Sequence, residues 1–237
     1  TVLKDERAKE GGYEVRSQEI KVINIAPPDF PIGEFQSTEL LLDNRHLAIR
    51  SRKMVAMSKI RATVLQAARQ WFIDNDWIEV NVPTIVKSAV EGGSTLFSLK
   101  YYDNEAYLSQ SAQLYLEALV FSLGPVWTLA PSFRAEKSRT VRHLAEFLHL
   151  EAESPWIEMD DLLRNQEKLL CGIVQKIILE RSEDLKYLNA DLSALNRIHE
   201  PFDRLKYDKA IEILQSMEIK VQEGETTRPV VWGDDLN

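Results

Sequence analysis

Near the middle of the sequence, charged and aromatic side chains recur at the spacing of two extended strands. Arg134 and Glu136 are two residues apart, so on an extended chain both point to one face. Phe147, His149 and Glu151 share one face of the returning strand in the same way. Such a surface suits a nucleotide, because a cation meets phosphates, a ring stacks on a base and carboxylates accept hydrogen bonds from amino groups.

The segment between these two strands adds basic side chains, namely Lys137, Arg139, Arg142 and His143. They would extend the cationic surface toward a phosphate group. A solvated hairpin laced with charges would have the same composition. Composition alone therefore does not separate a nucleotide site from an ordinary exposed hairpin.

The order of these residues resembles motif 2 of the class II aminoacyl-tRNA synthetases, in which Phe-Arg-x-Glu precedes a loop and a strand with a phenylalanine. Residues 133–140 and 142–147 are most similar to the asparaginyl/aspartyl subgroup. Residues 91–97, Glu-Gly-Gly-Ser-Thr-Leu-Phe, resemble the amino-acid-site loop of that subgroup. Residues 107–115, Tyr-Leu-Ser-Gln-Ser-Ala-Gln-Leu-Tyr, resemble its substrate-reading turn into a helix. Several matches in the family's order are far more specific than a lone short motif.

This resemblance implies activation of an amino acid by ATP with Mg²⁺, followed by transfer of the acyl group to tRNA. Arg134 would be the catalytic residue, bridging the α-phosphate and the substrate carboxylate with its planar fork. Glu136 would accept from the adenine amino group, and Phe147 would stack on the adenine ring. The implied ATP site comprises Arg134, Glu136, Arg142, His143, Leu144 and Phe147, with Arg142 and His143 at the outer phosphates. Without the resemblance, Arg134 and Glu136 would be interpreted as a surface ion pair and Phe147 as a core residue.

On the amino-acid side, the resemblance implies that Glu91 and Gln113 hold the α-ammonium group, with Arg134 at the carboxylate. Aspartyl enzymes of the subgroup carry a lysine where this chain has Leu116. A carboxylate without that cation would be costly to bury, whereas a carboxamide does not need it. Glu151 can accept from an amide nitrogen and would repel aspartate. Both features favour asparagine, and the expected partners are asparagine and tRNA-Asn.

Two other functions stay open at this point. One is an aspartate-activating paralogue, either an aspartyl-tRNA synthetase or a related enzyme that passes activated aspartate to ammonia. The other is a catalytically silent paralogue that keeps the fold as a binding protein, although the full set of substrate-contacting residue types argues against it. Glu151 also has a structural alternative, as a carboxylate that serves the neighbouring basic loop.

Length and composition set further bounds. The 237-residue chain can bury a sizeable core, and its net charge of −8 does not by itself indicate nucleic-acid binding, although a local cationic patch could provide it. The single cysteine, Cys171, lies in an apolar run, which excludes an intrachain disulfide and predicts a buried, inert thiol. A structural zinc site is not expected, and no metal ligand is assigned. No signal peptide and no apolar stretch of the ~20 residues of a membrane span are found, so a cytoplasmic protein is expected.

The sequence also predicts two domains. Residues 13–23 alternate like one or two strands and lead into a turn-rich linker. By resemblance, residues 1–36 are the end of an N-terminal anticodon-binding OB-fold domain with its linker. Residues 37–237 would be the class II catalytic domain, incomplete at its C-terminus because motif 3, a glycine-rich strand with a Glu-Arg pair, is not matched. We therefore leave open whether this chain is active by itself.

Residues 51–74 carry apolar side chains at helical spacing, and the extended residues 76–85 follow them. A helix, a strand and a proline in this order resemble motif 1, the dimer-interface element of the family, which implies a homodimer. An amphipathic helix buried inside a monomer would show the same pattern.

The rest of the pattern predicts a hairpin over residues 96–109 with its turn at Asp103–Asn104. A helix capped by Ser111 should follow and end before Pro125. Further predicted elements are a strand over residues 126–130 and helices over 160–181 and 207–217. Consecutive strands with helices outside them predict an α+β domain around an antiparallel sheet.

Overall fold

The computed structural model describes residues 1–237 except 9–10, 34–35, 88–95, 137–142, 224–225 and 236–237. By their contacts the residues group into two compact units, Thr1–Val55 and Ala56–Asn237. The first unit thus extends past residue 36, where the sequence predicts a domain boundary.

The first unit contains an antiparallel strand pair and two short helices, namely β1 (Val2–Lys4), β2 (Tyr13–Val15), α1 (Thr38–Asp43) and α2 (Arg45–Ala48). The strand predicted over residues 13–23 is confirmed only for Tyr13–Val15. β1 offers three residues for pairing, so the ladder ends at Val15. Beyond it, Ile20 and Ile23 are exposed and pair with no strand among the described residues, so alternation alone did not make a strand there.

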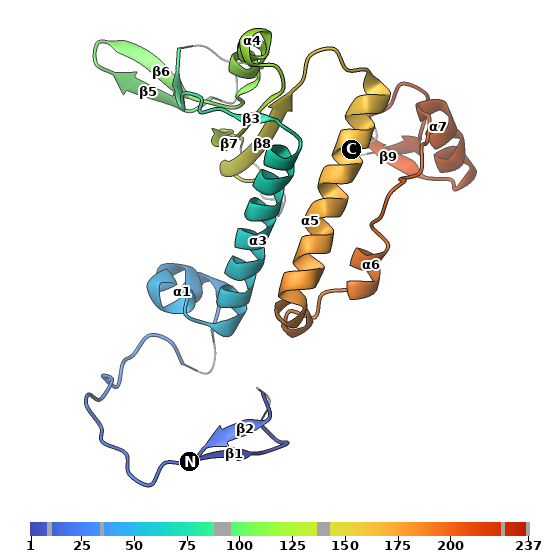
Figure 1. Ribbon diagram of the computed structural model, residues 1–237. Coiled ribbons are helices and arrows are strands. Elements are labelled where there is room, and N and C mark those ends of the chain that lie inside the picture. Colours follow the sequence, from blue (N-terminus) through green and yellow to red (C-terminus); the bar gives the residue numbers. More distant parts are fainter. Residues whose placement is uncertain (9–10, 34–35, 88–95, 137–142, 224–225, 236–237) are drawn as a thin grey trace. The chain divides into compact units, whose positions relative to one another are not determined.

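The second unit contains two three-stranded sheets (Figure 1). The first consists, in spatial order, of β3 (Ile78–Glu79), β7 (Val126–Phe133) and β8 (Glu146–Glu153). The second consists of β4 (Ile85–Val86), β6 (Asn104–Leu108) and β5 (Ser98–Tyr101). All pairs are antiparallel except β3 with β7, between which the chain passes through the second sheet and a helix.

The turn of the β5–β6 hairpin differs from the prediction by one residue. Tyr101 pairs with Asn104, so the two turn residues are Tyr102 and Asp103 rather than Asp103 and Asn104. Two-residue hairpin turns need a positive φ, which Tyr102 adopts at 54°. The preference for small polar turn residues was misleading here, because Tyr102 takes the turn position with an exposed side chain whose ring packs edge-on against Tyr101, with centroids 4.8 Å apart.

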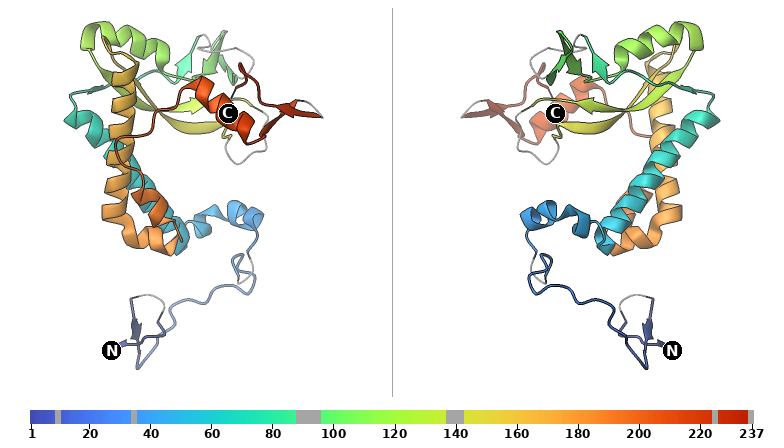
Figure 2. Two further views of the ribbon diagram at one scale, coloured as in Figure 1. Left: turned by 90° about the vertical axis from the view of Figure 1, so that its right-hand side faces the viewer. Right: turned by 90° about the vertical axis from the view of Figure 1, so that its left-hand side faces the viewer.

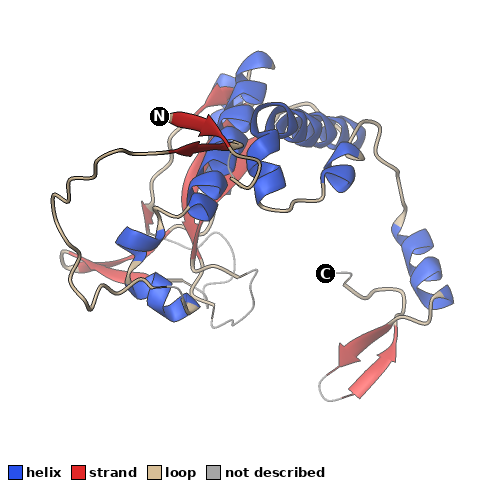
Figure 3. Cartoon of the chain, turned by 90° about the horizontal axis from the view of Figure 1, so that it is seen from below, coloured by secondary structure: helices blue, strands red, loops and turns tan. Residues whose placement is uncertain are grey.

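The helices and the last strands of the second unit are α3 (Arg52–Asp74), which begins in the first unit, α4 (Gln113–Leu123), α5 (Met159–Tyr187), α6 (Leu192–Asn196), α7 (Tyr207–Ser216), β9 (Lys220–Glu223) and β10 (Thr226–Pro229). The predicted helices over residues 51–74, 160–181 and 207–217 are confirmed, while α6 and the β9–β10 hairpin were not predicted. Figure 3 shows the resulting mixture of helices and strands, which confirms the α+β class.

The long helices α3 and α5 lie side by side (Figures 1 and 2). Arg181 of α5 donates a hydrogen bond of 2.8 Å from Nε to Oγ1 of the buried Thr63 on α3. Arg181 has non-helical dihedral angles, φ −129° and ψ 22°, and marks a kink in α5. The kink and the contact to α3 occur at the same residue.

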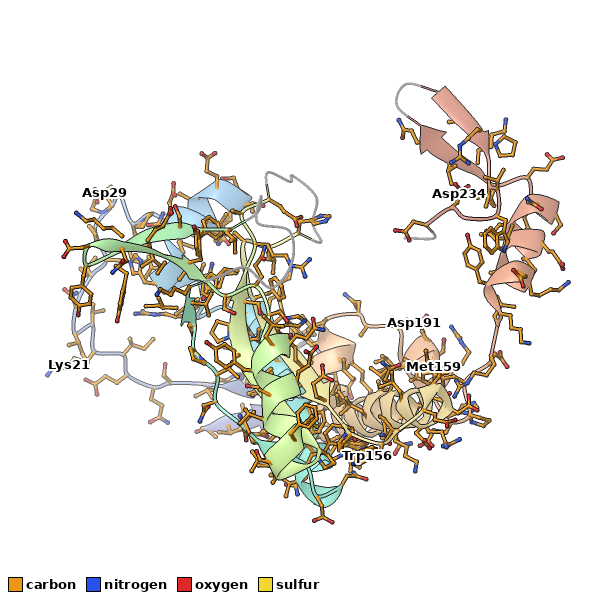
Figure 4. All side chains as sticks on the ribbon, turned by 90° about the horizontal axis from the view of Figure 1, so that it is seen from above. Lys21, Asp29, Trp156, Met159, Asp191 and Asp234 are labelled. Atoms are coloured by element: carbon orange, nitrogen blue, oxygen red, sulfur yellow. The ribbon has the colours of Figure 1, made fainter. Side chains whose placement is uncertain are left out.

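An ion pair joins β10 to the segment that follows it. Arg228 donates to both carboxylate oxygens of Asp234, at 2.7 and 2.6 Å, and Tyr207 donates from its hydroxyl to the Asp234 carbonyl at 2.7 Å. Figure 4 labels Asp234. The hydrogen bonds from Arg228 lower the pKa of Asp234 to about 2. These bonds tie α7 to the segment that follows β10.

The two faces of β7 bury different partners. Trp127 is fully buried on one face and stacks on Phe72 of α3, with ring centroids 4.6 Å apart. Val126 points to the opposite face and forms a core cluster with Ala112 and Leu116 at the start of α4. The sheet therefore separates a helical layer from the face that carries α4.

Replacing Leu116 with alanine is expected to lower the free energy of unfolding by about 2–5 kcal/mol, because a fully buried leucine leaves a cavity. Leu114→Ala is the matched control, since Leu114 lies on the same helix with half of its surface exposed. It should cost less than about 1 kcal/mol. Urea unfolding followed by circular dichroism measures both, and equal losses would contradict the core position of Leu116.

Candidate active site on the β7–β8 hairpin

The register of β7 and β8 builds one polar face. Phe147, His149 and Glu151 alternate along β8, and Ser132 and Thr128 of β7 stand opposite Phe147 and Glu151. Side chains directly opposite each other in an antiparallel pair lie on the same face of the sheet. The structure thus confirms that these three side chains share one face.

Arg134 follows the last residue of β7 and reaches back over this face. Its guanidinium carbon lies 5.9 Å from the centroid of the Phe147 ring, a cation–π contact. Its backbone N–H donates to the Ala145 carbonyl at 3.0 Å, which continues the ladder past the strand end. Arg134 is not ion-paired with the exposed Glu136 within the described chain, so a surface ion pair is not its role.

Glu151 joins β8 to the first turn of α4. The Ser111 hydroxyl donates to Glu151 Oε1, and the Ala112 N–H donates to Oε2 at 2.9 Å. Ala112 is the N-cap of α4, so the carboxylate also lies at the positive end of the helix dipole. His149 Nδ1 lies 3.3 Å from Oε2 and 3.2 Å from the Ser132 hydroxyl oxygen.

Ser111 was predicted as the cap of α4, and this prediction is wrong by one residue. Its hydroxyl oxygen does accept from the Gln113 N–H at 3.1 Å, but the hydroxyl proton goes to Glu151. A contact between residues forty positions apart decides this arrangement, and local sequence does not contain it. Ser111 and Ser132 are the site residues that the sequence did not single out.

The remaining predicted residues are placed less closely together. Gln113 is exposed, and its Nε2 donates to Glu117 Oε1 at 2.9 Å on the next turn of α4. Leu116 is fully buried in the core cluster. The side chains of Glu136, His143 and Leu144 are exposed. Glu91 and Arg142, as well as Lys137 and Arg139, lie outside the described residues.

Acidic side chains gather beside Glu151. Burial raises the pKa of Glu153, and the nearby charges of Glu117 and Glu151 raise it further. Glu153 is the next residue after Glu151 on the same face of β8. The Glu151 end of this face is therefore negative, while Arg134 makes the opposite end positive.

The site includes no obvious metal centre. Among the described residues, no three His, Cys, Asp or Glu side chains lie together in a way that could hold a metal ion. Cys171 is buried as predicted, and burial raises the pKa of its thiol. Within the described part of the chain, every helix is too short or too polar to cross a membrane.

Comparison with known proteins now becomes informative. The family model described as tRNA synthetases class II (D, K and N) matches residues 37–232. The chain belongs to the class II tRNA synthetases. This synthetase chain is 50% identical to the asparagine–tRNA ligase of Pyrococcus furiosus over 238 aligned residues, covering 99% of this chain and 52% of that protein.

Solved structures of the same family are also similar to this synthetase chain. The crystal structure of asparaginyl-tRNA synthetase from Pyrococcus horikoshii complexed with asparaginyl-adenylate superposes with a TM-score of 0.85 at 48% identity, covering 100% of this chain and 52% of that chain. The Entamoeba histolytica asparaginyl-tRNA synthetase in complex with asparaginyl-adenylate gives a TM-score of 0.77 at 35% identity, covering 95% and 49%. The chain spans about half the length of the curated relatives it matches.

Glu153→Gln is expected to raise the free energy of unfolding at neutral pH. The folded pKa of Glu153 lies above its ordinary value of 4.5, so its contribution to stability is fully present below that value and is lost as the pH rises through the folded pKa. The gain in the variant should therefore shrink on acidification and vanish below about pH 4. Urea unfolding of the variant and the parent, at neutral pH and below about pH 4, measures the difference in their free energies of unfolding.

Glu146→Gln serves as the control, because Glu146 is exposed at the start of the same strand. It should change stability little at either pH. A Glu153→Gln variant that is less stable than the parent at neutral pH would contradict the electrostatic argument.

Proposed function

We propose that this chain carries the amino-acid-activating site of an asparagine–tRNA ligase, which uses ATP to form asparaginyl-adenylate and then charges tRNA-Asn. The observation that carries the proposal is the single sheet face that joins Arg134 and Phe147 to Glu151. The two Pyrococcus proteins named above, 50% and 48% identical to this chain, support the same substrate.

The proposed reaction needs no nucleophile from the protein. The carboxylate oxygen of asparagine attacks the α-phosphorus of ATP, the new O–P bond forms, and pyrophosphate leaves with the electrons of the broken bond. Catalysis of such a step consists of positioning and charge neutralisation. Arg134 would meet both the α-phosphate and the attacking carboxylate, because its fork offers two parallel N–H donors. Phe147 would stack on adenine and so bring the α-phosphate to the arginine beside it.

Mg²⁺ belongs to the proposal as an ion carried by the ATP phosphates, where it would neutralise charge. The described residues offer no cluster of metal-ligating side chains. We therefore assign no Mg²⁺ ligand within them and draw no step through the ion.

Selection of asparagine over aspartate would come from charge. Glu151 keeps only 13% of its side-chain surface exposed, and it accepts from Ser111 and Ala112 while retaining lone pairs for a further amide donor. An aspartate carboxylate would face this negative group in a shielded position. Leu116 offers no cation to compensate, and it lies in the apolar core.

The family resemblance adds three further proposals. Residues 1–36 would belong to an anticodon-binding domain that contacts tRNA-Asn, the enzyme would work in the cytoplasm, and it would be a homodimer through α3 and β3. The dimer is supported by apolar side chains exposed on α3, since Met57 and Ile73 leave 45% and 53% of their surfaces uncovered.

Arg134→Ala is expected to lower ATP–pyrophosphate exchange with asparagine by about a hundredfold or more, as for loss of a group that stabilises charge in the transition state. Circular dichroism should show an unchanged fold, because the side chain of Arg134 is only partly buried. Arg197→Ala is the matched control, since Arg197 is exposed at the end of α6. Exchange that survives in Arg134→Ala would remove this residue from the mechanism.

Glu151→Gln is expected to raise the use of aspartate relative to asparagine by about tenfold, since it removes the repelling charge. Pyrophosphate exchange with both amino acids, run side by side, measures the ratio. Glu153→Gln removes the neighbouring carboxylate and should leave the ratio nearly unchanged. Exchange of the unaltered chain with aspartate alone would favour the aspartate-activating alternative, and exchange with neither would contradict the proposal for this chain.

A further inference from the structure

His149 lies where two sets of contacts meet. Its Nδ1 is 3.3 Å from Glu151 Oε2 and 3.2 Å from the hydroxyl oxygen of the buried Ser132. Its ring centroid is 5.4 Å from that of Phe147, with the planes tilted by 57°. None of the roles proposed above involves this side chain.

The neighbours of Nδ1 determine where the proton lies. An ionised carboxylate can only accept, so we place the hydrogen on Nδ1, which faces Glu151 Oε2 at 3.3 Å. The Ser132 oxygen can accept from the same N–H, which is then shared between two acceptors. This arrangement selects one tautomer and one orientation of the ring.

The first set of contacts runs from His149 to the start of α4. Glu151 Oε2 lies 3.3 Å from His149 Nδ1, and the carboxylate accepts from the Ala112 N–H and the Ser111 hydroxyl. The Ser111 oxygen in turn accepts from the Gln113 N–H. A rotation of the Glu151 carboxylate would thus disturb the first turn of α4, which holds the proposed amino-acid-binding residue Gln113.

The second set runs in the opposite direction along β8. The His149 ring packs against Phe147, and Arg134 lies over the same phenylalanine with its guanidinium carbon 5.9 Å from the ring centroid. Phe147 therefore contacts both a cation and an imidazole. A change in the orientation of the His149 ring would change the orientation of Phe147 relative to a base stacked on it.

We propose that His149 is a positioning residue that couples the ATP subsite to the amino-acid subsite. Its ring orients Phe147 and Arg134, and its Nδ1–H orients Glu151 and the first turn of α4. This inference rests on the proposed function and adds the residue that makes binding of one substrate favour binding of the other. Such coupling is reciprocal, so ATP and asparagine should each tighten the other's binding by the same factor.

Two substitutions separate the two sets of contacts. His149→Phe keeps an aromatic ring and removes the donor, so the Kd of asparaginol, which lacks the reacting carboxylate, should rise about tenfold while that of ATP changes less than about twofold. His149→Asn keeps a donor near the position of Nδ1 and removes the ring, so the opposite pattern is expected. Calorimetry with each ligand, alone and with the other present, measures affinity and coupling. In both variants the coupling factor should fall toward one.

Leu148→Ala is the control, because Leu148 lies on the same strand with its side chain on the other face. It should leave both Kd values and the coupling factor unchanged. If His149→Phe and His149→Asn weaken both ligands equally, or weaken neither, His149 is only a structural residue and the proposal is overturned.

A measurement without ligands separates this inference from the proposed function. Nitrogen-15 NMR of the imidazole should show the proton on Nδ1, and Glu151→Gln should shift that resonance. If the unaltered chain binds neither ligand, the proposed function fails for this chain. The NMR result still decides whether His149 Nδ1 donates to Glu151. A neutral His149 with its proton on Nε2 and a bare Nδ1 would overturn the coupling.

Discussion

The backbone ladder between β7 and β8 is the constraint on which the rest of the second unit depends. It pairs each residue from Val126 to Phe133 with one from Glu153 to Glu146. Because side chains alternate along a strand, a shift in register by one residue would turn the side chains of the shifted strand to the opposite face of the sheet. Trp127 would then leave its stacking partner Phe72, and the polar face would turn into the helical layer. Core and candidate site thus specify the same register.

That register also explains why a buried carboxylate is tolerated in the site. Glu151 is nearly covered, yet it accepts from a hydroxyl and from a backbone N–H at a helix N-terminus, and the imidazole of His149 lies 3.3 Å from it. A charge in such a position is stable only when its acceptor capacity is used. The same group is then fixed in place, which is what a site for reading a small amino acid requires. Structural and substrate-binding interpretations of Glu151 are therefore compatible.

Much of this architecture was predictable because it depends on local periodicity. The spacing of two along Phe147, His149 and Glu151 predicts their common face, and the register confirms it. The helical spacing over residues 51–74 predicts α3 almost to the residue. Predictions failed where a distant partner decides the outcome. Residues 16–23 alternate in polarity but pair with no strand among the described residues, and Ser111 directs its proton to Glu151 on β8 instead of simply capping α4.

The sequence by itself determined the family, the α+β class and the residue types that can meet a nucleotide, because ordered motifs and periodicity are properties of the chain alone. Only the tertiary structure decided which of those residues touch. It placed Arg134 over Phe147 rather than against Glu136, it put Leu116 in the apolar core, and it joined His149 to Glu151 and α4. These outcomes depend on contacts between segments far apart in sequence, and such contacts form only when the sheet and α4 pack together.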